Sequence, residues 1–234
     1  MLSEWLFITT EYIALVATSM SGAFVAIGKR LDLIGVWFLS LIASFGGGVL
    51  RDLLLGETPP RFFTHYHWLL TVTLVSLAVF IVARYWKGYW HPRVRRVLDS
   101  VHNVLDAVGL AAFTVSGVQL ALAAGHTDNL FLCAFMGVIT GVGGGVIRDI
   151  MVMEMPGILH KRVYAVASMI GAVLYWVCLR YAMPEGVAWA IAMTSIVAIR
   201  ICATVFRWNM PHVPIPEEAP SETEQINERE MIKK

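Results

Sequence analysis

The sequence predicts an all-α membrane protein with seven transmembrane helices, and three observations lead to that prediction. Hydrophobic residues make up 57% of the 234-residue chain and charged residues only 15%, against about 45–50% and 25% in soluble domains. Seven apolar runs are each about long enough to cross a ~30 Å hydrocarbon core. A motif of three glycines followed by Val, a hydrophobic residue, Arg and Asp occurs at residues 46–52 and again 97 residues later, at 143–149.

The apolar runs follow one another along the chain with short polar connections. They cover Tyr12–Gly28, Leu33–Leu50, Tyr66–Ala83, Ala107–Gly125, Asn129–Ile147, Val163–Leu179 and Gly186–Phe206, the last interrupted only by Arg200. The N-terminal residues lack the basic segment and the cleavage site of a secretory signal, so the first span is expected to stay in the protein. Residues 1–208 then form one membrane domain, and the acidic residues 209–234 are expected to be a disordered cytoplasmic tail.

Basic residues are distributed unequally between the two sides of the predicted membrane domain. Leaving out the motif arginines, Arg200 and the polar tail, ten Lys and Arg fall on one side and two, Arg61 and Arg180, on the other. The positive-inside rule therefore predicts an outside N-terminus and a cytoplasmic C-terminus. The formal net charge of +1 gives no reason to expect nucleic-acid binding.

The two motif copies belong to a longer internal repeat. Eight of fourteen residues are identical between 46–59 and 143–156. At an offset of 95, Glu11 aligns with Asp106, and Ser21-Gly22 aligns with Ser116-Gly117. The first repeat is predicted to span about 7–84, the second about 99–182, and the seventh helix, about 186–206, lies outside both. Because each repeat holds three spans, an odd number, the copies must cross the membrane in opposite directions. This inverted arrangement places a permeation or substrate site near the bilayer midplane.

The glycine triplets predict weak points in the second and fifth helices. Consecutive glycines favour a kink or a break, so we predict helices kinked or broken at residues 46–48 and 143–145. Carbonyl groups freed there can bind a cation where they face protein or water. Arg51 and Arg148 lean back over the triplets, where the missing side chains leave room for the guanidinium groups.

The charges of the two motifs need partners. Each would cost about 2.5–3.5 kcal/mol if it were unpaired in dry lipid. Adjacent residues of a helix point about 100° apart, so the partner of each arginine is expected from another span, with Glu11 and Asp106 as candidates. The alternative to a functional role is a purely structural one. Arg51 and Asp52 lie ~27 Å along a straight helix and would reach the lipid headgroups. The glycines would then only permit close helix packing.

The residues predicted to border an ion path are the two glycine triplets, the two Arg-Asp pairs and one serine near the first triplet. They are Gly46, Gly47, Gly48, Arg51, Asp52, Gly143, Gly144, Gly145, Arg148, Asp149 and Ser44. Secondary candidates are Glu11, Ser21, Asp106 and Ser116, although small polar residues are also common at helix contacts. The histidines and cysteines show no metal-binding spacing and no catalytic motif occurs, so we expect neither an enzyme nor a cofactor.

The arrangement of spans and motifs resembles the prokaryotic trimeric intracellular cation channel (TRIC) family, whose bacterial members are also labelled as a glycine-transporter domain family. The resemblance rests on three plus three inverted plus one spans, on Gly-Gly-Gly-x-x-Arg-Asp in spans two and five, and on Ser-Gly in spans one and four. It covers roughly residues 7–206. It implies a homotrimer in the bacterial inner membrane, in which each protomer has its own hourglass-shaped, potassium-permeable pore beside kinked second and fifth helices.

The same resemblance defines the expected ligands and partners. The permeant ion is K+, with Na+ as a second candidate, and neither an obligatory protein partner nor nucleic acid is expected. Ser44 aligns with Gly141, so a symmetrical role for this serine is not expected. The additional lipid-binding basic motif of the animal members is not evident in this chain.

Two other functions remain open from the residues. A small secondary carrier for glycine or a similar zwitterion would bind the substrate carboxylate at Arg51 or Arg148. An arginine beside a half-helix N-terminus favours an anion as readily as a cation, so cation selectivity follows from the family resemblance. The third class is a structural membrane subunit, which the charged repeat disfavours.

Overall fold

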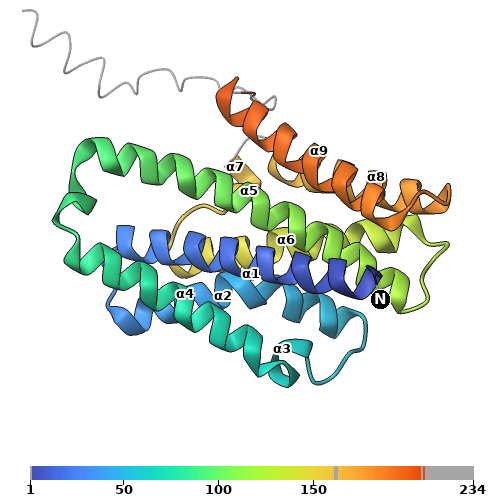
Figure 1. Ribbon diagram of the computed structural model, residues 1–234, viewed down its shortest axis with the longest axis horizontal. Coiled ribbons are helices and arrows are strands. Elements are labelled where there is room, and N and C mark those ends of the chain that lie inside the picture. The colour runs from blue at the N-terminus through green and yellow to red at the C-terminus, as the bar shows by residue number, and fades with distance from the viewer. Residues whose placement is uncertain (1, 161–162, 207, 209–234) are drawn as a thin grey trace, which may run out of the picture.

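Seven long helices form the protein, as a computed structural model covering residues 2–160, 163–206 and 208 shows. They are α1 (Leu2–Gly28), α2 (Leu33–Leu54), α4 (Tyr66–Tyr85), α5 (Pro92–Ala123), α6 (Leu130–Met151), α8 (Tyr164–Arg180) and α9 (Glu185–Val205). Short helices α3 (Arg61–Thr64), η1 (Lys87–Trp90) and α7 (Gly157–His160) lie in the connections. The long helices form one bundle in which successive helices reverse direction (Figure 1). The predicted tail, 209–234, lies outside the described residues.

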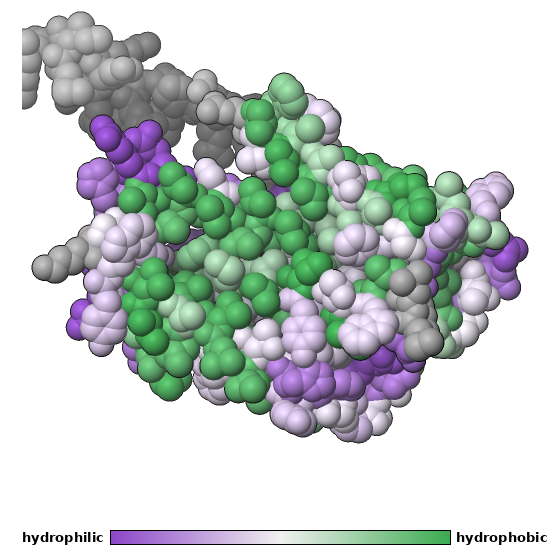
Figure 2. All heavy atoms as spheres, viewed as in Figure 1, coloured by the Kyte–Doolittle hydropathy of each residue, from purple (hydrophilic) through white to green (hydrophobic). Residues whose placement is uncertain are grey.

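The helices have the length and composition of membrane spans. Six of them are long and apolar enough to cross a bilayer, and Tyr164–Arg180 is a shorter apolar helix of 17 residues. Hydrophobic side chains cover much of the face in Figure 2, while hydrophilic residues gather toward its ends. Large apolar side chains such as Leu74 and Phe131 are exposed, at 57% and 80%. The prediction of an all-α membrane protein is confirmed, and a seventh membrane crossing stays a prediction.

Two helices begin well before the apolar runs that predicted them. α5 starts at Pro92 instead of Ala107, and α1 starts at Leu2 instead of Tyr12. The additional residues of α5 are largely polar, so hydropathy did not mark them, whereas in α1 the acidic residues Glu4 and Glu11 interrupt an otherwise mostly apolar stretch. Proline at the first position of α5 suits a helix start, and the His91 side chain accepts a hydrogen bond from the Arg93 N–H. With 32 residues, α5 is about 48 Å long.

The glycine triplets do not break their helices. Both α2 and α6 run through them without interruption, so the prediction of broken helices is wrong, while a bend without a break stays a prediction. The middle glycines lie where the two helices cross. A Cβ on Gly47 would overlap the Thr140 carbonyl oxygen, and one on Gly144 would overlap the Ala43 carbonyl oxygen. Close packing of two backbones explains the glycines, and intact helices keep the backbone hydrogen bonds satisfied in lipid.

The contacts of the two predicted repeats match element by element. Helix α1 packs on α2 and α4, as α5 packs on α6 and α8, and α2 contacts α4 as α6 contacts α8. The equivalent helices α1 and α5 run in opposite directions (Figure 1). They pack on each other, as do α2 and α6, so the centre of the bundle consists of two equivalent pairs. α9, outside the repeats, packs on α8 and α5.

The helix crossing gives the first testable prediction. Gly47→Ala should lower the apparent melting temperature of the purified protein in detergent, because a methyl group would meet a backbone carbonyl that no rotamer change can move. Overpacking of this kind costs about 1–3 kcal/mol. Gly28→Ala is the matched control, since a Cβ there meets nothing within 4 Å. A Gly47→Ala protein as stable as the control would show that the close crossing does not exist.

Candidate functional site

Arg51 is the centre of a buried polar cluster near the C-terminal end of α2. Its Nε and Nη2 lie 2.9 and 2.8 Å from Asp52 Oδ1. Its Nη1 donates a 3.4 Å hydrogen bond to Ser116 Oγ on α5. Ser116 in turn donates a hydrogen bond to the Glu11 carboxylate on α1. All four side chains are buried, and we call them the first cluster.

Arg148 is the centre of an equivalent cluster near the C-terminal end of α6. Its Nε and Nη2 lie 2.9 and 2.7 Å from Asp149 Oδ1. Its Nη1 donates to Ser21 Oγ on α1 at 2.7 Å and lies 3.4 Å from Asp106 Oδ1 on α5. These four buried residues are the second cluster. Ser21 Oγ also lies 3.3 Å from Nδ1 of His102.

The clusters bring together the motif charges and all four secondary candidates of the sequence analysis. Each arginine bonds the serine of the other repeat, so the two repeats are tied together through these side chains. The expectation that the arginines would pair with another span instead of the adjacent aspartate is wrong in part. Each guanidinium turns sideways onto the next aspartate. The carboxylates of Glu11 and Asp106 complete the clusters, through Ser116 in the first case and directly in the second.

The motif aspartates also fix the connection that follows each helix. The second carboxylate oxygen of Asp52 accepts a 2.8 Å hydrogen bond from the Arg61 N–H, the first residue of α3. The equivalent oxygen of Asp149 accepts a 2.9 Å bond from the Gly157 N–H, the first residue of α7. One carboxylate therefore neutralises the arginine and anchors the chain after the helix, which explains why Arg and Asp occur as a pair.

The outer two glycines of each triplet have distinct surroundings. A Cβ on Gly143 would lie 3.0 Å from the Cα of Gly47, so this glycine also serves the crossing. A Cβ on Gly46 would lie 3.0 Å from Ile147 Cδ1. Cβ atoms on Gly48 and Gly145 would lie 3.6 and 3.8 Å from their own motif guanidinium groups. The guanidinium groups therefore lie over the triplets as predicted, although the last two distances are ordinary contacts that would also accommodate an alanine.

A small cavity lies beside the first cluster. It has a volume of about 20 Å³ and is lined by Glu11, Ser44, Arg51 and Trp68 among others, which gives room for about one water. Ser44 Oγ accepts a 3.1 Å hydrogen bond from Thr18 Oγ1. The matching space beside Arg148, lined by Gly145, Val146, Arg148, Asp149, Gly157, Ile158 and Tyr164, has a volume of about 0 Å³. The two sites are therefore alike in residues but differ in openness.

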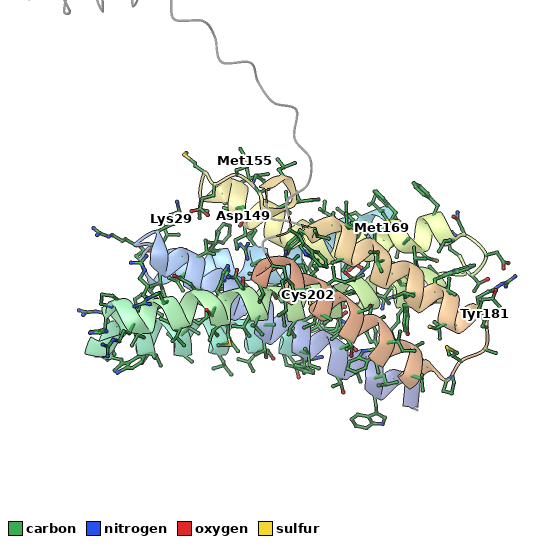
Figure 3. All side chains as sticks on the ribbon, turned by 90° about the horizontal axis from the view of Figure 1, so that it is seen from above. Lys29, Asp149, Met155, Met169, Tyr181 and Cys202 are labelled. Atoms are coloured by element: carbon green, nitrogen blue, oxygen red, sulfur yellow. The ribbon has the colours of Figure 1, made fainter. Side chains whose placement is uncertain are left out.

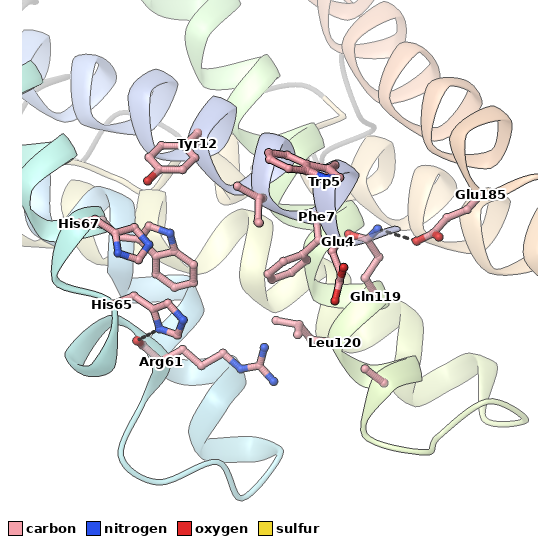
Figure 4. A pocket seen from close by; sticks show the side chains of 13 residues that line it. Glu4, Trp5, Phe7, Tyr12, Arg61, His65, His67, Gln119, Leu120 and Glu185 are labelled. Carbon is pink, nitrogen blue, oxygen red and sulfur yellow. Dashed lines mark hydrogen bonds between the residues drawn. The ribbon is translucent and has the colours of Figure 1, made fainter. Parts of the chain in front are cut away.

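A larger cavity opens at each end of the bundle. The one beyond the first cluster measures about 1030 Å³, and we call it the vestibule. Figure 4 shows Tyr12, Arg61, His65 and His67 along one part of it, with Glu4, Gln119 and Glu185 along another. Trp68 lines both the vestibule and the small cavity. At the opposite end, a 140 Å³ cavity is lined by residues that include Tyr89, Arg95, Asp99 and His102.

The second cluster lies toward the end that carries the 140 Å³ cavity. Figure 3 shows Asp149 toward the same end as Lys29, with Tyr181 at the opposite end. Lys29 forms a 2.8 Å ion pair with Glu154, just after α6. His102 lines the 140 Å³ cavity and contacts Ser21, so polar side chains lead from that cavity to Arg148.

Three residues of the site were not selected from the sequence. Arg200 of α9 places its Nη2 3.6 Å from Asp106 Oδ2, and its guanidinium carbon lies 4.5 Å from the centre of the Tyr164 ring. His102, which showed no metal-binding spacing in the sequence, contacts Ser21. The available signal was Arg200 itself, a single charge within an apolar span, which is costly unless it has a partner.

The ion pairs give the second prediction. Arg148→Gln should destabilise the protein by about 3–5 kcal/mol, because Asp149 would remain buried without its arginine and Asp106 would lose one of its two. Arg180→Gln is the matched control, since its 2.9 Å pair with Asp128 is exposed at 61% and 78% and should be worth less than about 1 kcal/mol. Thermal unfolding of both variants in detergent measures the difference. Equal shifts would show that the second cluster is not sealed from water.

Comparison with known proteins identifies the family. The sequence model of the Glycine transporter family matches two stretches of the chain, residues 8–84 and 103–180, which coincide with the two repeats. A UPF0126 membrane protein of Vibrio cholerae is 34% identical over 194 residues, 82% of this chain and 75% of that protein. The UPF0126 inner membrane protein YadS of Escherichia coli K12 is 33% identical over 211 residues, 90% of this chain and 94% of that protein.

Solved structures share the fold. One, from a study of the structural basis for conductance through TRIC cation channels, is 37% identical, with a TM-score of 0.77 over 91% of this chain and 99% of that chain. A TRIC trimeric intracellular cation channel orthologue from Rhodobacter sphaeroides is 29% identical, with a TM-score of 0.77 over 86% of this chain and 98% of that chain. The chain belongs to the Glycine transporter (UPF0126) family of membrane proteins, and its fold is that of the prokaryotic TRIC channels.

Proposed function

We propose that the protein is a passive, potassium-permeable cation channel whose ion path lies within each protomer. The path runs from the vestibule past the first cluster, along the α2 and α6 crossing and past the second cluster to the 140 Å³ cavity. The observation that carries the proposal is the presence of two equivalent charged clusters between two end cavities of one helix bundle. The 37% identity to a TRIC cation channel structure supports the same function.

The charge of the clusters favours a cation. Each motif arginine already has its own aspartate within 2.9 Å. Glu11 and Asp106 add a further carboxylate to each cluster, and fixed negative charge lowers the barrier to a cation while it repels anions. Because α2 and α6 are continuous, side-chain oxygens and water, not freed carbonyls, are proposed to replace the hydration shell of the ion.

Conduction requires movement from the described conformation. The cavities beside the two clusters measure about 20 and 0 Å³, and a hydrated K+ does not fit through either. Trp68 and Tyr164 line these constrictions. Rotation of aromatic side chains or a bend at the glycines would open them, so the structure fits a closed state of the channel.

Assembly and location follow from the relatives. We propose a homotrimer in a bacterial inner membrane, with the N-terminus outside and the C-terminus in the cytoplasm. The Rhodobacter sphaeroides orthologue is a trimeric channel, and YadS is an inner membrane protein. The unequal distribution of basic residues supports the orientation.

A carrier for glycine or a similar zwitterion is the second candidate. The family description favours it, as does a vestibule that carries Arg61 on one part and Glu4 and Glu185 on another. Binding of the substrate carboxylate at Arg51 or Arg148 is less favoured than the sequence suggested, since both arginines are already bonded to their own aspartates. A substrate carboxylate would have to displace them.

Planar-bilayer recording of the purified protein is the third test. We expect unitary K+ currents whose reversal potential follows the K+ gradient, and altered permeation in Arg148→Ala and Asp149→Ala. Glu11→Gln should reduce unitary conductance by about twofold or more, because it replaces a buried carboxyl group that accepts the Ser116 hydrogen bond beside the path. Glu57→Gln, at an exposed position, is the matched control and should conduct normally.

Two outcomes would contradict the channel. A folded, correctly assembled preparation without currents would count against it, and saturable glycine uptake into proteoliposomes without unitary conductance would favour the carrier. If the Arg148→Ala and Asp149→Ala proteins assemble normally and conduct like the original chain, the path does not pass the second cluster.

A further inference from the structure

The repeated residues give the two clusters the same charge. Each repeat supplies one guanidinium and two carboxylates, namely Arg51 with Glu11 and Asp52, and Arg148 with Asp106 and Asp149. If every group is ionised, each set has a formal charge of −1. Any electrical difference between the two halves of the path must therefore come from residues outside the aligned motifs.

Helix α9 supplies such a residue to one cluster. Arg200 is 4% exposed, and its Nη2 lies 3.6 Å from Asp106 Oδ2, while Arg148 Nη1 lies 3.4 Å from Asp106 Oδ1. Asp106 thus lies between two guanidinium groups, one from the repeated motif and one from the helix outside the repeat. By formal count of Arg148, Arg200, Asp106 and Asp149 alone, the second cluster is neutral.

The first cluster gains no equivalent cation from α9, which packs on α5 and α8. Arg61 also contacts this cluster, but through its backbone N–H, which donates a hydrogen bond to Asp52. The Arg61 side chain extends into the vestibule (Figure 4), where solvent screens its charge. By formal count of the described side chains, the first cluster keeps a charge of −1.

Arg200 also acts on the shape of the second site. Its guanidinium lies over the Tyr164 ring at 4.5 Å, a cation–π distance. Tyr164 lines the space beside Arg148, which measures about 0 Å³, whereas Trp68 lines the matching 20 Å³ cavity at the first site. The closed site is therefore the one whose aromatic side chain is held by an additional cation.

We propose that Arg200 makes the ion path electrically and sterically asymmetric. It pairs with Asp106 and holds Tyr164 in the constriction at the second cluster, whereas Glu11 and Asp52 at the first cluster receive no such guanidinium from α9. The proposal rests on the proposed channel function for its effect on ion flow. The part of the proposal in which Arg200 holds Tyr164 at the constriction does not depend on ion flow.

Arg200→Gln tests the electrical part. The substitution keeps a polar side chain, although a shorter one, and leaves the counted second cluster at −1, so unitary K+ conductance should rise by about twofold or more. In a KCl gradient, the reversal potential should move toward the K+ equilibrium potential. Arg200→Lys keeps the charge and should resemble the original protein in selectivity. Asp106→Asn combined with Arg200→Gln restores neutrality and should return both readouts toward the original values.

A labelling experiment tests the constriction without relying on currents. In a chain with its native cysteines replaced, Val146→Cys places a thiol in the lining beside Arg148 and Tyr164. A trimethylammonium methanethiosulfonate should label this thiol at least about threefold faster when Arg200→Gln is added, because a cation is attracted and the aromatic ring is released. The Asp106→Asn and Arg200→Gln pair should reduce the gain, since the attraction is gone.

The outcomes separate this inference from the channel function. Unchanged conductance, reversal potential and labelling in a correctly assembled Arg200→Gln protein would overturn the role of Arg200. Faster labelling in a protein that never conducts would contradict the proposed channel function. It would still support Arg200 as the residue that closes the second site. Loss of assembly in Arg200→Gln together with changed selectivity in Arg200→Lys would show that the side chain supports the fold and does not set the charge.

Discussion

A guanidinium buried in a membrane-spanning bundle must be paired, and this requirement organises the protein. Arg51 and Arg148 each lie in a helix with at most 3% exposure. Each meets its adjacent aspartate and a serine of the opposite repeat. A carboxylate on a neighbouring helix completes each cluster, Asp106 by direct contact with Arg148 and Glu11 through Ser116. These contacts require α1, α2, α5 and α6 to meet at two depths. The central four-helix arrangement therefore satisfies the charges and also defines the polar region through the bundle.

The glycine crossing provides the distance that these contacts need. Because Gly47 and Gly144 let α2 and α6 approach until their backbones touch, the motif arginines at their ends reach serines on α5 and α1. A pair of larger residues at the crossing would separate the helices and pull the clusters apart. The triplet and the Arg-Asp pair thus form one structural unit, in which packing at the crossing positions the charges one turn away.

The sequence was sufficient for much of the architecture but not for several contacts. Apolar runs predicted the helices, and the internal repeat identified the aligned residues Glu11, Ser21, Asp106 and Ser116. Both features can be detected from the amino-acid sequence without knowledge of tertiary contacts. The glycine triplets were predicted to kink or break their helices, with close helix packing as the alternative. The structure supports the packing, and the sequence could not decide because helix propensity is local and the crossing partner Thr140 is distant in sequence. The Arg51–Asp52 pair was missed because a long side chain can turn away from the direction of its Cβ. Arg200 belongs to no repeat, so only the fold brings it to Asp106.

The central claim is that ions cross each protomer beside the two arginine clusters, and current block at an introduced thiol tests it most directly. With the native cysteines replaced, Val49→Cys places a thiol in the small cavity of the first cluster. Leu74→Cys, at an outward position that is 57% exposed, is the control. The account predicts that a cationic methanethiosulfonate applied during K+ current blocks Val49→Cys and leaves Leu74→Cys unaffected. Modification of Val49→Cys, verified by mass, with an unchanged current would contradict it.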